Sequence, residues 1–139
     1  MNPIYSSAPI ADPGTLQLLG RYAQSTNATP PTASTPLLLT IDGTYRIRLR
    51  AVGESRMVVS SRLCPLPEPG LARDHMLERL GALACGTMQR SAAACVVDEQ
   101  EQAVWLQQTA QPVSTQDIDD LVGEFVNELA FWVGVVRNV

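Results

Sequence analysis

The C-terminal end of the sequence, from Ser114 to Val136, has the apolar spacing of one long amphipathic helix. Its opposite face carries the acidic residues Asp117, Asp119, Asp120, Glu124 and Glu128. A helix with one face this apolar needs a sheet or a second chain to cover it. The apolar residues, which fall on a single helical stripe, are Ile118, Leu121, Val122, Phe125, Leu129, Trp132, Val133 and Val136.

Three short segments in the middle of the chain have the pattern of β-strands. The turn signal Asp42-Gly43 separates the first two, and Gly53-Glu54 separates the second from the third. Strands joined by tight turns predict an antiparallel meander. In the second segment Arg46, Arg48 and Arg50 alternate with apolar residues, which indicates one buried and one wet face. The three segments are Leu37–Ile41, Tyr45–Ala51 and Met57–Leu63.

Two more segments are predicted to be strands, and a capping residue is predicted at the start of the final helix. Ala92–Val97 and Ala103–Thr109 predict a second hairpin around the acidic turn Asp98–Glu101. Ser114 is the expected N-cap of the final helix, and Asp117 occupies the acid position of a capping box.

Two further helices are predicted ahead of that final one. The first begins at Pro13 with Asp12 as its N-cap and ends near Gln24. The second spans Leu71–Cys85 after a proline-rich break, and Gly86 is its expected stop. Residues 1–12 are expected to form a loose arm, and 25–36 a flexible loop rich in Ser, Thr, Ala and Pro.

This order, α-β-β-β-α-β-β-α, predicts an α+β fold with a twisted five-stranded antiparallel sheet and three helices. Residues 1–139 are expected to form one domain.

The net charge of −4 argues against a nucleic-acid partner. All ten basic residues are arginine, a composition typical of a GC-rich bacterial source. The three cysteines have no framework spacing, and neither a signal peptide nor a membrane span is apparent, so a reduced, cytoplasmic protein is expected.

The sequence offers little that resembles a catalytic site. His75 is the only histidine, and a solvated helix residue is its simpler interpretation. Cys64, Cys85 and Cys95 lack the paired spacing of a zinc site, and small buried side chains explain them better. Neither a Walker motif nor a G-x-G-x-x-G motif is present. No catalytic residue, metal or cofactor is therefore assigned, although a small-molecule-binding or metal-binding α+β enzyme or sensor, using Cys85, Cys95 and His75, stays open as an alternative.

The element order and several local stretches resemble a known family. The run from Met57 to Pro67, MVVSSRLCPLP, leads through a proline break into the helix Leu71–Cys85. The hairpin stretch Val104–Gln108 and the closing-helix stretch Phe125–Asn127 follow in the family order. Over Thr15–Val136 the chain resembles the class I type III secretion chaperones of the Tir-chaperone (CesT-like) group, from which the long loop 25–36 departs.

The resemblance implies a virulence-associated cytoplasmic homodimer without enzymatic activity or ATP use of its own. Such a chaperone holds the N-terminal region of a secreted effector in extended form, keeps it competent for export and delivers it to the export apparatus, with the export ATPase as a further partner. No membrane insertion is implied.

The resemblance suggests two residue sets. The effector-binding set is Leu16, Leu19, Tyr22, Leu38 and Trp105, and the dimer-interface set is Met76, Leu77, Leu80, Leu83 and Val96. Arg46, Arg48 and Arg50 either steer an acidic partner segment or are simply solvated. An adaptor that holds a folded partner is a third hypothesis.

Overall fold

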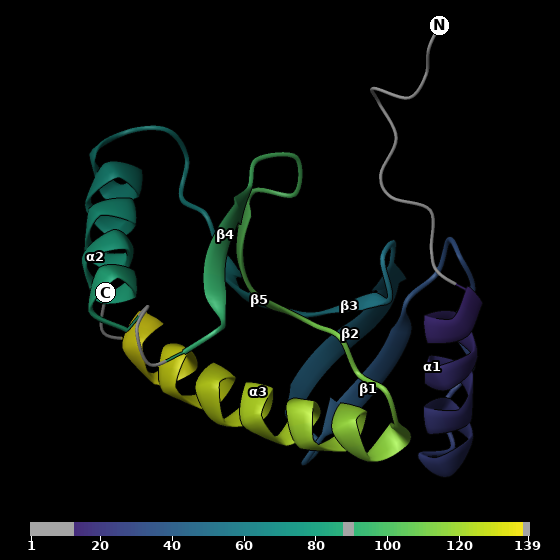
Figure 1. Cartoon of the computed structure of the whole chain (residues 1–139). Helices are drawn as coiled ribbons and strands as arrows, with labels where there is room; N and C mark the ends of the chain where they lie inside the picture. Colours follow the sequence, from purple (N-terminus) through teal and green to yellow (C-terminus); the bar gives the residue numbers. More distant parts are fainter. Residues whose placement is uncertain (1–12, 88–90, 138–139) are drawn as a thin grey trace, which may run out of the picture.

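The computed structural model describes residues 13–87 and 91–137, and its elements follow the predicted α-β-β-β-α-β-β-α order. The predicted arm and Asp12 lie outside these residues. Figure 1 shows a twisted sheet with α3 running beneath it, while α1 and α2 stand at opposite ends. The elements are α1 (Pro13–Ser25), β1 (Leu37–Ile41), β2 (Tyr45–Val52), β3 (Arg56–Pro65), α2 (Leu71–Thr87), β4 (Ala94–Asp98), β5 (Ala103–Ala110) and α3 (Thr115–Val136).

The five strands form one antiparallel sheet in the order β1-β2-β3-β5-β4. The meander of β1, β2 and β3 is confirmed, and Asp42 and Gly43 adopt the positive φ values, 54° and 66°, that a tight hairpin turn requires. The second hairpin joins through β5, so β1 and β4 are the two edges. A register shift between Arg62 and Cys64 lets β3 continue to Pro65, beyond the predicted end at Leu63.

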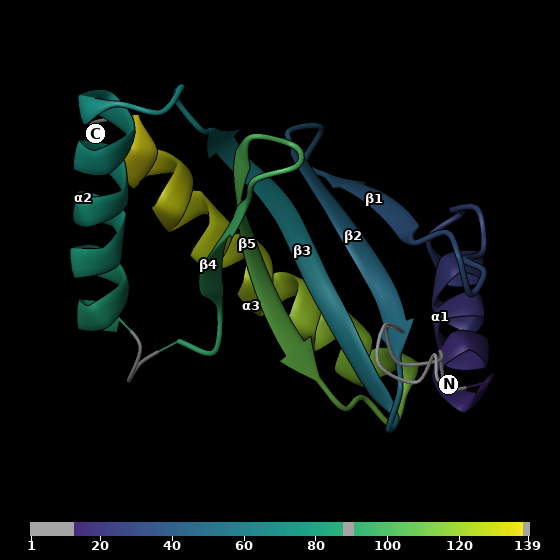
Figure 2. The same cartoon turned by 90° about the horizontal axis from the view of Figure 1, so that it is seen from above.

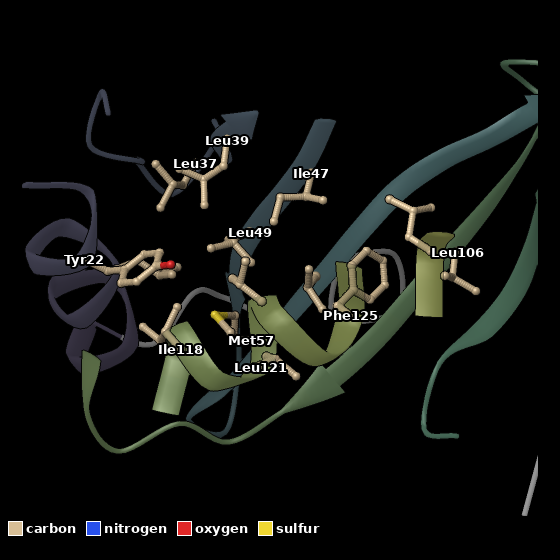
Figure 3. Packing of buried hydrophobic residues seen from close by; sticks show 14 of the residues in the cluster. Tyr22, Leu37, Leu39, Ile47, Leu49, Met57, Leu106, Ile118, Leu121 and Phe125 are labelled. Carbon is tan, nitrogen blue, oxygen red and sulfur yellow. The ribbon is translucent and has the colours of Figure 1, made fainter. Parts of the chain in front are cut away.

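The core lies between one face of the sheet and the helices α1 and α3 (Figure 3). Because side chains alternate along a strand, every second residue of β2 points into it: Ile47, Leu49 and Ala51 are buried. Phe125 of α3 is completely buried against the same face. The predicted stripe of α3 is confirmed: its buried members are Ile118, Leu121, Val122, Phe125, Leu129 and Trp132.

The start of α3 agrees with its predicted cap, whereas the end of α2 differs from the prediction. Ser114 caps α3 by accepting a hydrogen bond from the Asp117 backbone N–H at 3.1 Å, as expected. The Asp117 carboxylate, however, accepts from the Val113 N–H at 2.9 Å, one residue before the cap. The prediction that Gly86 stops α2 is wrong: Gly86 has no positive φ, and the helix continues through Thr87. No helix within the described ranges is long and apolar enough to span a bilayer.

Candidate functional site

Within residues 13–87 and 91–137, no helix covers the face of the sheet opposite α3, and Figure 2 looks down onto this face. The strand register determines which residues share this open face: Leu38 lies opposite Arg48, and Trp105 lies between Arg62 and Val96. The side chains of Arg48 and Arg62 are exposed there. Arg46 and Arg50 flank Arg48 on the same side of β2, since they alternate with its buried residues.

Trp105 occupies the middle of this open face. The guanidinium carbon of Arg48 lies 4.5 Å from the centroid of the Trp105 ring, within the range of a cation–π contact. The indole Nε1 of Trp105 is buried and has no hydrogen-bond acceptor among the described residues. Buried polar groups without a partner are rare in folded proteins because they have lost their water.

Three hollows lie in sequence across the open face and its β1 edge. The first, of about 760 Å³, lies beside β1, between the strand and the end of α1 with its following loop. The second, of about 460 Å³, is shared by Leu38, Arg46, Arg62 and Trp105. The third, of about 540 Å³, extends from Trp105 to the β4–β5 turn. Leu38 lines the first two hollows and Trp105 lines the last two, and we call the three hollows together the open-face groove.

The five residues that the sequence suggested for effector binding separate into two groups. Leu38 is 63% exposed and lines the open-face groove with Trp105, although the two are far apart in the sequence. Leu19 and Tyr22 belong to the core, and Leu19 has no exposed surface. Tyr22 contributes to the wall of the hollow at the β1 edge, whereas Leu16 is half-buried beside the core. An effector-binding role stays a prediction for all five, and Leu19 is the least accessible to a partner.

The residues suggested for a dimer interface lie on α2 and β4, at the end of the sheet opposite α1 (Figure 1). Leu80 is buried within the chain. Met76, Leu77, Leu83 and Val96 are only partly buried. Leu80 and Thr87 are the only buried residues of α2. The helix therefore leaves much of its apolar surface uncovered by the described chain.

The residues of the enzyme alternative are scattered rather than gathered. His75 is exposed on α2, and Cys85 is exposed near the end of that helix. Burial raises the pKa of the Cys95 thiol to about 11, with a smaller contribution from Cys64. Burial also raises the pKa of Cys64, so both thiols hold their protons and are poor nucleophiles at neutral pH. Within residues 13–87 and 91–137, no three His, Cys, Asp or Glu side chains are placed to hold a metal.

Two features of the open face were not predicted from the sequence. The first is the contact between Arg48 and Trp105, and the second is the position of Arg62 beside that ring. Strand alternation put Arg46, Arg48 and Arg50 on one face but did not say which strand would lie next to β3. The sequence pattern did not show that β3 pairs with β5, the strand that contains Trp105.

Neither a protein-family model nor a curated protein matches the sequence. Solved structures do match it. A chain of the HopA1–SchA chaperone–effector complex aligns with a TM-score of 0.64 at 16% identity, covering 88% of this chain and 98% of its own. A chain of the ExsC–ExsE complex gives 0.63 at 14% identity, covering 84% and 89%.

A third match is the structure of the Yersinia pestis type III secretion chaperone SycH with a stable fragment of YscM2. It gives a TM-score of 0.57 at 13% identity and covers 85% of this chain and 98% of the matched chain. The three matches cover 84 to 88% of this chain. The chain therefore has the α+β fold found in type III secretion chaperone complexes, as the sequence resemblance predicted.

Proposed function

We propose that this protein is a bacterial, cytoplasmic type III secretion chaperone of the CesT-like group, without enzymatic activity. It binds the N-terminal region of a secreted effector in extended form and keeps that effector competent for export. The observation that carries the proposal is the fold, which this chain shares over most of its length with chains from chaperone–effector complexes. The described residues add the open-face groove, which offers a place for a client segment.

The β1 edge supports binding of an extended polypeptide. Among the described strands β1 pairs only with β2, so its other side is a sheet edge at which a further strand could pair. An extended segment adds to such an edge through main-chain hydrogen bonds, and its alternate side chains enter neighbouring pockets. The hollow beside β1 and the exposed side chain of Leu38 provide such a place. A globular partner would not follow a strand edge in this way, which favours the extended client over a folded one.

The exposed apolar surface of α2 supports a homodimer. Leu71 of α2 is 87% exposed, and Phe131 of α3 is 47% exposed. A helix gains most of its stability in water from packing its apolar face, so a helix with two buried residues calls for a further cover. In the proposed dimer the second copy covers Met76, Leu77 and Leu83, with Val96 at the margin. The export ATPase is then the partner to which the loaded dimer passes its client.

Deleting the gene in the source bacterium tests this function. We expect that one or a few secreted proteins disappear from the culture supernatant, as measured by mass spectrometry, while other substrates of the system are unaffected. Complementation with the wild-type gene restores them, and complementation with the Leu38→Glu variant does not. The restored protein should co-purify with the chaperone, and its bound segment should be cleaved readily by a protease, as extended chain is. Unchanged secretion in the deletion strain would exclude the proposal.

A further inference from the structure

The open face of the sheet carries four arginines that form no ion pair with a described residue. Arg46, Arg48 and Arg50 from β2 and Arg62 from β3 are all exposed there. The only ion pair of the described chain joins Arg56 to Glu54, at the β2–β3 turn. Four of the ten basic residues thus lie on one face of a protein whose net charge is −4. A cluster of like charges costs folding energy, and a partner of opposite charge relieves that cost.

Acidic residues are absent from β1, β2 and β3, whereas β4, which also contributes to this face, ends in Asp98. Asp98, Glu99 and Glu101 lie at the far end of the open-face groove, in and beside the β4–β5 turn, where they form part of its wall. The positive part of the groove is consequently its middle, where Arg46, Arg48 and Arg62 surround the hollow between Leu38 and Trp105.

Apolar surface accompanies the charge. Leu38 projects from the β1 edge with 63% of its surface exposed, and the Trp105 ring forms part of the same hollow. A ligand that fills this space needs both an apolar group and anionic groups around it. An acidic polypeptide in extended form has this composition, because it offers carboxylates to the arginines and a backbone to the open edge of β1.

We propose that the open-face groove binds an acidic, extended segment of the client polypeptide, with one of its apolar side chains in the hollow between Leu38 and Trp105. This rests on the proposed function and specifies the chemistry of the client at this site. A nucleic acid fits the arginines less well, since its phosphates would also meet the acidic wall formed by Asp98, Glu99 and Glu101. The net negative charge of the protein repels a polyanion further.

Two matched variants separate local charge from total charge. Arg46→Gln with Arg62→Gln removes two charges from the hollow, and Arg21→Gln with Arg137→Gln removes two from exposed positions of α1 and the end of α3. Both double variants have the same net charge. Neither pair of arginine side chains makes a hydrogen bond or ion pair with a described residue, so both variants should fold, which far-UV circular dichroism and thermal unfolding check.

The probe is a short fluorescein-labelled peptide of glutamate and serine around a single leucine, and its control carries glutamine in place of glutamate. By fluorescence anisotropy the wild-type protein should bind the acidic peptide about tenfold more tightly than the control, and rising NaCl should weaken the binding. The Arg46/Arg62 variant should lose this preference, whereas the Arg21/Arg137 variant should keep it.

Several results would overturn the inference. These are equal affinity for the two peptides, equal effects of the two double variants, and arginine-dependent binding of an oligouridylate in place of the acidic peptide. A change of oligomeric state in the Arg46/Arg62 variant alone, seen by light scattering, would instead assign the face to a second copy. In the deletion strain, full restoration of export by that variant overturns this inference and leaves the chaperone function intact. Failure of the wild-type gene to restore any secreted protein overturns the function itself.

Discussion

The hydroxyl of Tyr22 donates a hydrogen bond to Oδ1 of Asp119 at 3.0 Å, and this contact joins α1 to α3. Tyr22 is 4% exposed, while Asp119 lies on the solvent side of α3. This hydrogen bond therefore links α1 to α3 at the edge of the core. Burial, together with the hydrogen bond to Asp119 and its negative charge, raises the pKa of Tyr22 from 10.0 to about 12.

The raised pKa predicts a loss of stability at high pH. In the unfolded chain Tyr22 ionises near its ordinary pKa, whereas the folded protein retains the proton until about pH 12. Between these two values the native state binds more protons, so the free energy of unfolding falls as pH rises. The free energy of unfolding should be unaffected by this titration below about pH 10 and should fall by roughly 3 kcal/mol by about pH 12, since one pKa unit corresponds to about 1.4 kcal/mol.

Urea unfolding of wild type and Tyr22→Phe from roughly pH 9 to pH 12 measures this effect. The variant should lose about 1 kcal/mol at neutral pH with the hydrogen bond, and its stability should fall less steeply above pH 10. Tyr45→Phe is the control, because it removes a half-buried phenol away from the α1–α3 contact. Parallel pH profiles for wild type and Tyr22→Phe would contradict the assignment.

Two adjacent aromatic residues of α3 should differ sharply in their importance for stability. Trp132 is 1% exposed and Phe131 is 47% exposed, with their rings edge to face at 5.8 Å. Trp132→Ala should cost about 3 to 5 kcal/mol, since it leaves a cavity in the core. Phe131→Ala should cost less than about 1 kcal/mol in the isolated subunit. Chemical denaturation of both variants at low protein concentration measures the difference, and similar losses would mean that the helix is rotated relative to this structure.

Leu19 and Leu38 allow a direct test of which apolar residues are core and which are binding surface. Leu19→Glu should prevent folding, because it places a charge where no solvent reaches. Leu38→Glu should change stability by less than about 0.5 kcal/mol, yet abolish export of the client, since its side chain lies in the open-face groove. Circular dichroism reports the first effect and secretion assays the second. A folded Leu19→Glu protein that fails to bind its client would return the site to α1.

Local sequence patterns account for most of the elements. Asp42-Gly43 predicted a turn that the structure contains, and the alternation around Arg48 predicted its exposed face. Long-range pairing was not predictable in this way. The contact of Arg48 with Trp105 depends on β5 lying next to β3, a choice made by packing across the whole sheet. Glycine signals also depend on context: Gly86 fits within a helix when no left-handed conformation is imposed on it.

The hydrophobic pattern of the sequence also did not predict how deeply individual side chains of α1 and α2 are buried. Leu16, Leu19 and Tyr22 share one helical stripe in the sequence, but Leu16 is only partly buried whereas Leu19 and Tyr22 belong to the core. The same holds on α2, where Leu80 is buried and Leu77 is not. The helical period predicts which side of the helix a side chain is on, but it does not predict how deeply that side chain is buried.

The proposed dimer makes Leu77 and Leu80 of α2 behave differently. We expect the wild-type protein to have twice the 15.0 kDa mass of one chain by light scattering after gel filtration. Leu77→Glu should shift it to a single chain with its circular dichroism spectrum preserved, because Leu77 is only partly buried within one subunit. Leu80→Ala should lower the stability of the subunit by about 2 to 5 kcal/mol instead, since Leu80 is 3% exposed. Glu78→Gln, a change at the exposed neighbour of Leu77, should leave the dimer intact. A wild-type protein that stays a single chain at micromolar concentration, or a Leu77→Glu protein that stays a dimer, would remove α2 from the interface.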